Sequence, residues 1–384
     1  MNLVVRLLIG LAFGVLCGLL APELLVRLLM TVKAIVGELI GFSVPLILLF
    51  YISSGIASLP AGSGRLLGRT LGLAYGSTLL AGTLAFLVAR YVLPILVSPH
   101  QLAGDTGQQL TPFFTLAIPA PMAVMTALVL AFVLGLALAG RESALRQVLE
   151  DGKGVVEKLL ANLIIPALPF YIAGEFAQMT FEGKVWSTLQ TFGLVLVMAV
   201  MLHWLWLAVL YGATGAVRGR SGLLLLKTMV PAYVTAIGTM SSAATIPVAL
   251  RQAKKNGVSE PVADFAMPLL ANIHLSGSTI TLVSCTTAVM LLNPELGIPD
   301  LGTMLGFILM LGVTMIAAPG APGGAVMAAL GLLSSMLGFS EANLALMIAL
   351  YLAQDSFGTA CNVTGDGALA LLADSAQPKL ATDR

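Results

Sequence analysis

Charged residues are scarce in this sequence, since Asp, Glu, Lys and Arg together make up 10% of 384 residues. Soluble domains carry about 25%. Hydrophobic residues make up 58%, and the mean hydropathy is +0.99. A soluble domain is therefore excluded, and we predict a multi-pass protein of the lipid bilayer. The net charge of +1 gives no indication of a nucleic-acid partner.

Two further absences narrow the class. Alternating strands of about ten residues, typical of an outer-membrane barrel, do not occur. The three cysteines, Cys17, Cys285 and Cys361, lie in apolar segments without metal-ligand spacing, so we interpret them as small core residues. The sequence thus predicts an all-α polytopic membrane protein.

The apolar segments in the first half of the chain predict six membrane spans. Apolar segments fall at about 4–20, 34–58, 68–97, 120–139, 155–178 and 187–216, with polar connections such as SLPAGSGR and RESALRQVLEDGKG between them. The first segment lacks a convincing cleavage site, so we expect it to be retained. Basic residues concentrate in alternate connections, which predicts that both termini lie in the cytoplasm. The helical spans and the compact, prokaryote-like length predict the inner (plasma) membrane.

Two later segments predict re-entrant hairpins. The segment 224–252 contains Pro231, Gly238 and Pro247 around TMSSAAT, and a crossing there would place Arg251 on the wrong side. The segment 302–338 has the tip AAPGAPGGA between two apolar arms. A kinked spanning helix stays an alternative for the first hairpin, and a simple turn for either tip.

A helix follows each hairpin, which brings the expected total to eight spans. The first, 261–292, is broken by NIHLSGST, and the second, 342–373, carries polar residues. Hairpin–helix, hairpin–helix is an internal repeat of inverted topology. Paired broken segments of this kind are typical of a transporter site near the membrane midplane.

The helix 342–373 carries the most informative polar residues, namely Asp355, Thr359, Asn362 and Asp366. Spacings of four, three and four residues place them on one helix face, over roughly 16 Å. A carboxylate at membrane depth costs ~2.5 to above 10 kcal/mol unless it is paired or hydrated. We therefore predict a ligand and ion path, with a satisfied polar seam between helices as the alternative.

These motifs resemble the dicarboxylate/amino acid:cation symporters, which include the glutamate transporters and the bacterial serine/threonine transporters. The resemblance covers nearly the whole chain. It is closest in SSAATIPV, the PGAPGG tip and DSFGTACNVTGD. It implies eight membrane helices and two opposed re-entrant hairpins in a homotrimer, whose transport domain moves as an elevator against a scaffold.

The resemblance also implies a division into domains. Scaffold and trimerisation helices take 1–62 and 99–183, and the transport domain takes 63–98 and 184–376. A cytoplasmic tail, 377–384, ends the chain.

The resemblance assigns roles to the polar helix. Asp355 matches the aspartate that holds the substrate's amino group, and Thr359 adds a polar contact beside it. Asn362 matches an asparagine near the substrate carboxylate and a sodium site. Asp366 matches the carboxylate that binds that sodium ion. Hard oxygen ligands suit sodium, and an ammonium group needs a counter-charge.

The two hairpin tips are implied to complete the substrate site. Ser241 and Ser242 match a serine-rich tip that receives the substrate carboxylate. The second tip matches the extracellular gate of the family, where glycine and proline permit a tight turn: Gly320, Ala321, Pro322 and Gly323.

Departures from the family pattern indicate the substrate. Gly358 stands where members that transport acidic amino acids have arginine, and Met240 at another such position. A substrate carboxylate would then lack a bidentate partner. Gly358 is also expected to leave space. We therefore predict a small neutral amino acid such as serine, threonine or alanine, driven by sodium, without an organic cofactor.

The break in the helix 261–292 departs too. His274 and Ser276 stand where many members have asparagine and aspartate, so Ser276 weakens a further sodium site to which His274 belongs by position. His274 has three readings: a neutral replacement for the asparagine, a substrate contact or a titrating group. His203, in LHWLWL, is expected at an interface or in scaffold packing.

Other functions stay open. A proton-coupled or sodium-independent carrier of another small amino acid or carboxylate is the main alternative. An intramembrane hydrolase is remote, because no G-x-S-x-G occurs and Asp355 and Asp366 are too far apart to share a proton. We therefore do not expect an enzyme.

Overall fold

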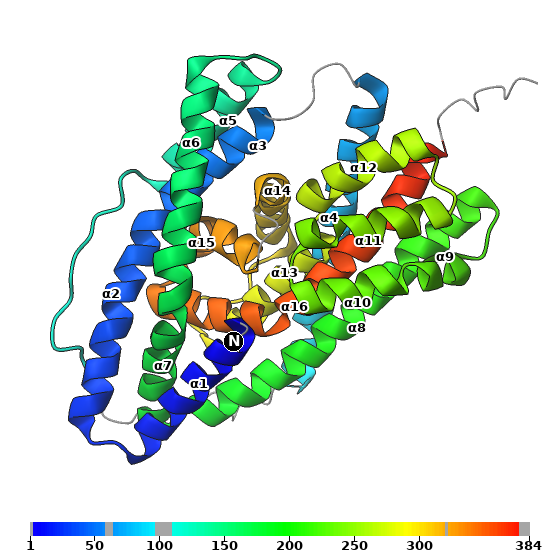
Figure 1. The fold of residues 1–384 in the computed structure, drawn as a ribbon. Coiled ribbons are helices and arrows are strands. Elements are labelled where there is room, and N and C mark those ends of the chain that lie inside the picture. The colour runs from blue at the N-terminus through cyan, green and yellow to red at the C-terminus, as the bar shows by residue number, and fades with distance from the viewer. Residues whose placement is uncertain (1–2, 58–63, 97–109, 319–321, 376–384) are drawn as a thin grey trace, which may run out of the picture.

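The computed structural model describes residues 3–57, 64–96, 110–318 and 322–375, and every regular element in this part of the chain is a helix (Figure 1). An all-helical protein is thus confirmed. Six of its helical segments are long and apolar enough to cross a membrane, or up to seven if a bent pair counts as one.

The six long segments include several that run through a change of helix type. They are α2 (Glu23–Ile47) with η1 (Leu48–Ile52) and α3 (Ser53–Ala57); α4 (Gly64–Leu96); α6 (Ala144–Leu159) with η3 (Leu160–Ile164) and α7 (Ile165–Phe181); α8 (Val185–Arg218); α12 (Glu260–Ile273) with α13 (Ser276–Leu292); and α16 (Glu341–Asp374). The elements η1 and η3 are single π-helical turns. Two of the expected spans, α1 (Leu3–Leu20) and α5 (Val124–Leu138), are shorter apolar helices.

One expected connection is wrong, because RESALRQVLEDGKG is mostly helical. The helix α6 starts at Ala144, where the Ser143 hydroxyl accepts the N–H of Arg146 as an N-cap. Arg146 also pairs with Glu150 at the favourable i,i+4 spacing, with 3.0 Å between Nε and Oε1. Polar residues therefore extend the helix beyond its apolar part, whereas hydropathy alone places the start near residue 155.

Each of the two segments predicted as hairpins forms two packed helical arms, and the first arm of the first segment is itself bent. The first comprises α9 (Gly222–Thr228), α10 (Val230–Thr239) and α11 (Ser242–Lys255), with a 45° bend between α9 and α10. The turn between α10 and α11 lies at Met240, whose φ of 52° is left-handed. The second comprises α14 (Leu301–Ala317) and α15 (Gly324–Leu337). The first segment is thus two packed helices rather than one kinked helix.

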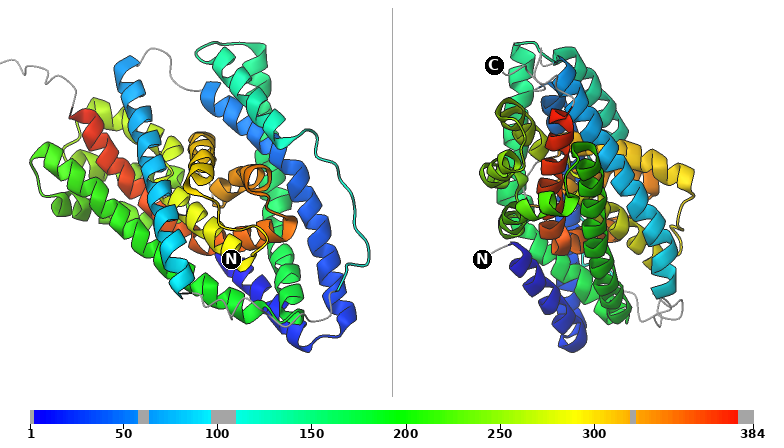
Figure 2. Two further views of the ribbon diagram at one scale, coloured as in Figure 1. Left: turned by 180° about the vertical axis from the view of Figure 1, so that it is seen from behind. Right: turned by 90° about the vertical axis from the view of Figure 1, so that its right-hand side faces the viewer.

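The helices gather into two groups (Figures 1 and 2). One group contains α1, α2, α3, α5, α6 and α7, with α7 packed along both α1 and α2. The other is built on α16, which contacts α8, α10, α11, α12 and α13, with α4 packed along α13. The pair α14–α15 joins them, since α14 packs on α4 and α15 contacts both α2 and α16.

The broken helix α12–α13 and the helix α16 form the centre of the second group. Within the most apolar 18-residue window of each span, 89% of α12–α13 and 78% of α16 is buried, against 33% of α4. Polar side chains on α13 and α16 therefore face other protein groups, whereas α4, α6–α7 and α8 leave apolar side chains on the outer surface.

Candidate functional site

The polar face of α16 is fully enclosed. Asp355, Thr359, Asn362 and Asp366 lie in one uninterrupted helix, and each exposes 5% of its surface or less. The predicted spacing and burial are thus confirmed. Among the described residues, no lysine or arginine forms an ion pair with either carboxylate.

Asp355 faces the start of α15. Its Oδ2 accepts the backbone N–H of Gly323 at 2.7 Å, and Gly323 is the N-cap of α15 with a φ of 76° that suits glycine. The partial positive charge of a helix N-terminus favours a carboxylate there. Asp355 and Gly323 of the second hairpin tip are therefore in contact. Pro322 is half-buried beside Gly323, while Gly320 and Ala321 lie outside the described residues.

Asn362 holds the start of α13. Its Oδ1 accepts the backbone N–H groups of Gly277 (2.7 Å) and Ser278 (3.1 Å), and its Nδ2 donates to the hydroxyl of Ser278 at 2.9 Å. The N-cap residue of α13 itself, Leu275, has no capping side chain. The Asn362 amide therefore caps α13 from a different helix and fixes the break against α16.

Asp366 lies at the other side of the same break. Its Oδ1 is 2.8 Å from His274 Nδ1, and His274 Nε2 is 2.8 Å from the hydroxyl oxygen of Ser77 on α4. His274 is fully buried in the two-residue break between α12 and α13. The structure thus brings His274 and Asp366 together. Ser276, two residues after His274, is the first residue of α13, and its buried hydroxyl has no partner in the described part of the chain.

Two glycines bring α13 and α16 into close contact. A Cβ atom on Gly277 would lie 2.4 Å from the carbonyl oxygen of Gly358, a distance that real Cβ atoms do not show. A Cβ atom on Gly358 would lie 3.2 Å from Thr281 Oγ1. The space expected above Gly358 is therefore already filled by α13, and the expectation of open room there is wrong.

His203 is a buried packing residue of α8. It is fully buried, and its Nε2 lies 3.0 Å from the Gly277 carbonyl oxygen and 3.1 Å from Thr281 Oγ1. This burial fits the packing role that was one of the two expectations for His203, and the interfacial alternative is wrong because Trp204, and not His203, is exposed. The buried residues of α8 recur every three or four positions, and this period includes 203 and 206 but not 204.

The first hairpin tip is built by its own polar groups. Ser241 is the N-cap of α11 and accepts the N–H of Ala244 at 3.3 Å, while Ser242 is buried at the first helical position. Met229, just before α10, lies against Gly367 near the C-terminal end of α16. The helix α10 then packs along α16.

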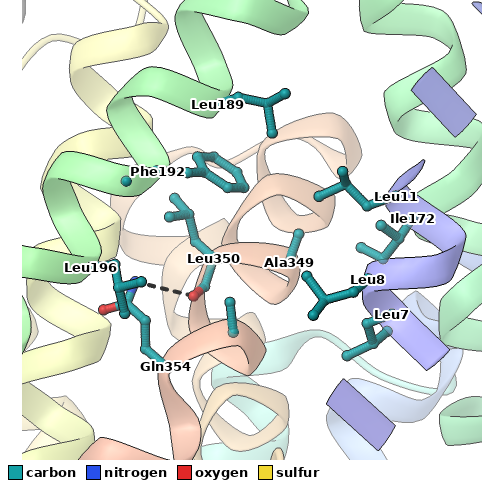
Figure 3. Close-up of a pocket in the computed structure, with 12 residues that line it drawn as sticks. Leu7, Leu8, Leu11, Ile172, Leu189, Phe192, Leu196, Ala349, Leu350 and Gln354 are labelled. Atoms are coloured by element: carbon teal, nitrogen blue, oxygen red, sulfur yellow. Dashed lines mark hydrogen bonds between the residues drawn. The ribbon is translucent and has the colours of Figure 1, made fainter. Parts of the chain in front are cut away.

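Two hollows border this region. One lies beside the second hairpin tip and is lined by Pro322, Gly323, Gly324 and Met327 together with residues of η1, α6 and η3. The other, between α1, α7, α8 and α16, is lined almost entirely by leucine and other apolar side chains (Figure 3). Its one amide, Gln354, donates to the Leu350 carbonyl of its own helix at 3.1 Å. The second hollow therefore offers little to a charged substrate.

The geometry can serve a zwitterion and a hard cation. The N-termini of α13 and α15 meet the polar face of α16, where their backbone N–H groups bind Asn362 and Asp355, and the Asp355 carboxylate suits an ammonium group. The contacts described engage one of the two carboxylate oxygens of Asp366, so its second oxygen fits a cation such as sodium. The nitrogens of His274 do not, because both are engaged.

Comparison with known proteins identifies this arrangement. The profile of the sodium:dicarboxylate symporter family matches residues 3–376, which is nearly the whole chain. The chain belongs to the sodium:dicarboxylate symporter family. The resemblance drawn from the hairpin and helix motifs is thus confirmed. The family consists of transporters, so the protein is a membrane transporter and not an enzyme.

Relatives of the symporter carry two different substrate names. A serine/threonine transporter SstT of Acinetobacter baumannii (strain ATCC 17978) is 28% identical over 347 residues, covering 84% of each chain. Another SstT, from A. baumannii strain SDF, is 31% identical over 253 residues, covering 62% of this chain and 60% of the relative. A C4-dicarboxylate transport protein of Sphingopyxis alaskensis is 26% identical over 353 residues, covering 84% of this chain and 76% of the relative. The family description names sodium as the coupling ion.

Proposed function

We propose that this symporter moves a small neutral amino acid, such as serine, threonine or alanine, into the cell together with sodium. The observation that carries the proposal is Asp355, a buried carboxylate with no lysine or arginine partner among the described residues, at the N-terminus of α15. Such a carboxylate needs a cationic partner, and the ammonium group of an amino acid supplies one. The substrate carboxylate would then face the backbone N–H groups of the hairpin tips, including Ser241 and Ser242.

Acidic amino acids are excluded as substrates in this proposal because of the surroundings of Gly358. Its position carries no side chain, and Thr281 and Ser278 of α13 pack against it. A second carboxylate on the substrate would have no bidentate partner there. Thr359, one residue beyond Gly358 and buried, is the proposed contact for a small hydroxyl side chain. The serine/threonine relatives support this choice over the C4-dicarboxylate relative.

The proposal places sodium at the Asp366 end of the polar face. The second oxygen of Asp366 is the proposed ligand, with Asn362 fixing the neighbouring backbone of α13 rather than giving its own amide oxygen. Sodium binding at this position stabilises the α13–α16 contact, on which the substrate carboxylate site depends. Because the substrate site depends on the sodium site in this way, the binding of sodium and the binding of substrate are coupled.

The membrane arrangement is part of the proposal. Eight spans and two re-entrant hairpins in the inner membrane, with both termini in the cytoplasm, accommodate the six long helices, α1 and α5, and the pairs α10–α11 and α14–α15. The group of α4, α8 to α13 and α16, with α14–α15, is the proposed transport domain. The group of α1 to α3 and α5 to α7 is the proposed scaffold, which would assemble as a homotrimer through segments around 34–58 and 120–178.

Uptake into proteoliposomes tests the proposed function. Labelled serine is supplied with an inward sodium gradient and then with choline in place of sodium, and unlabelled threonine, alanine, aspartate and succinate compete. We expect sodium-driven uptake that threonine or alanine blocks and that the two dicarboxylates do not. Uptake blocked by succinate or aspartate would contradict the neutral substrate, and sodium-independent uptake would favour the alternative carrier.

A further inference from the structure

His274 joins three helical segments at one buried point. It lies in the break between α12 and α13, its Nδ1 is 2.8 Å from Asp366 Oδ1 on α16, and its Nε2 is 2.8 Å from Ser77 Oγ on α4. His274 and Asp366 expose 0% and 1% of their surfaces, and Ser77 exposes 6%. The imidazole ring therefore fills the space between a hydroxyl group and a carboxylate.

The hydrogen-bond directions at this ring follow from its partners. An ionised carboxylate only accepts hydrogen bonds, so His274 Nδ1 carries a proton and donates to Asp366. The Ser77 hydroxyl can then donate to Nε2 of the neutral ring. Both ring nitrogens are satisfied in this way without an ion or a solvent molecule, and the side of the ring that faces Asp366 is its N–H side.

The same space has the features of a site for a hard cation. The Asp366 carboxylate and the Ser77 hydroxyl are oxygen ligands of the kind that such cations prefer, and the ring separates them. A further buried oxygen lies directly after the same break. The hydroxyl of Ser276, two residues along the chain, is fully buried and has no hydrogen-bond partner among the described residues.

We infer that the His274 ring takes the place of a coupling cation between Ser77 and Asp366, so that shortening this side chain creates a sodium site. The inference rests on the proposed sodium symport, since it concerns how many sodium ions accompany one substrate. In the natural chain the N–H group of the ring supports the carboxylate permanently. Sodium is then left with the other oxygen of Asp366, and one ion fewer binds in each transport cycle.

Replacement of His274 by the shorter asparagine tests the inference, alone and together with Ser276→Asp. Asparagine keeps an amide oxygen but removes the ring, and the aspartate adds a ligand where the hydroxyl has no partner. We expect the sodium activation curve of serine uptake to become steeper by one ion in the double variant. We also expect sodium, added to the substrate-free detergent-solubilised variant, to raise the melting temperature more than it does for the natural protein.

The matched control is His203→Asn, the same change at a second fully buried histidine that bonds a carbonyl and a hydroxyl instead of a carboxylate. It is expected to keep the natural steepness of the sodium curve. Ser77→Ala is a second check that leaves His274 in place. If no ion binds between Ser77 and Asp366, this change leaves the sodium dependence of the melting temperature unaltered.

Two results would overturn the inference. One is a folded double variant whose sodium-induced rise in melting temperature equals that of the natural protein. The other is a loss of sodium-induced stabilisation in Ser77→Ala, which would make Ser77 a sodium ligand already. Failure of the proposed function is distinguishable, because it shows as absent sodium-driven serine uptake by the natural protein, while the melting-temperature comparison still applies.

Discussion

Asp355 and Asp366 are two buried carboxylates on one face of one helix, yet the protein holds them differently. Asp355 accepts a backbone N–H from the tip of a helical pair, beside a hollow. Asp366 accepts from a buried imidazole that is itself bound to a third helix. The Gly323–Asp355 contact thus borders a hollow, whereas the imidazole is enclosed by packed helices. The Asp355 end and the Asp366 end of this face therefore suit different ligands.

The largest effect is expected from Asp355→Asn. The amide oxygen can still accept the Gly323 N–H, so the fold is retained, but the charge proposed to face the substrate's ammonium group is lost. Loss of one partner of a buried charge pair costs about 2–5 kcal/mol, so serine uptake should fall by roughly 30-fold to 4,000-fold. Asp300→Asn is the matched control, since Asp300 caps α14 on the exposed surface and asparagine caps equally well. Equal uptake by both variants would contradict the role of Asp355.

Between the two carboxylates, Gly358→Arg is expected to abolish serine uptake without creating aspartate uptake. The first atom of the new side chain would lie 3.2 Å from Thr281 Oγ1, a tight contact that forces the arginine or Thr281 to shift, so we expect the guanidinium not to reach the substrate. Adding Thr281→Ala removes this obstacle, and aspartate should then compete in an uptake assay. Aspartate uptake by the single variant would show that α13 yields at this position, and the neutral substrate would rest on the missing arginine alone.

Gly277→Ala tests whether the close contact of α13 and α16 keeps Asp355 and Asp366 in their positions relative to α13. The added methyl group would lie 2.4 Å from the Gly358 carbonyl oxygen, so the helices must separate. Overpacking of this kind costs about 1–3 kcal/mol. We expect a lower midpoint of unfolding in denaturant. Gly306→Ala on α14 has open space around its Cβ position and serves as control. An unchanged midpoint for Gly277→Ala would mean that the contact is not tight.

The smallest effect is expected at Asn362. Asn362→Ala removes the acceptor for two N–H groups of α13, a loss comparable to that of an N-cap, about 0.5–2 kcal/mol. Asn362→Asp keeps the acceptor oxygen and loses the donor to Ser278. A thermal melt should therefore rank the natural protein above Asn362→Asp and Asn362→Asp above Asn362→Ala. The reverse order of the two variants would show that the amide N–H matters more than the cap.

Much of the site could be predicted from the sequence because helical spacing is a local property. The spacing of Asp355, Thr359, Asn362 and Asp366 places them on one face whatever surrounds the helix, and the polar residues of NIHLSGST indicate the break between α12 and α13. Glycine and proline likewise indicate the turns of both helical pairs.

The partners of these residues could not be predicted, because they come from distant parts of the chain. Ser77 and His274 are 197 positions apart, and nothing local at Ser77 indicates the contact. The packing of Thr281 on Gly358 is equally a result of how two helices approach. His203 is the exception, since the three-to-four-residue period of apolar positions on α8 could have placed it on the buried face.

The central claim, that Asp355 serves the substrate and Asp366 the cation, is tested most directly by thermal-shift titrations of Asp355→Asn and Asp366→Asn. Purified protein is melted at increasing sodium concentration without substrate, and then at increasing serine concentration in saturating sodium. We expect Asp355→Asn to keep the sodium response and lose the serine response, and Asp366→Asn to lose sensitivity to sodium. An unchanged sodium response in Asp366→Asn, or equal loss of both responses in both variants, would contradict the account.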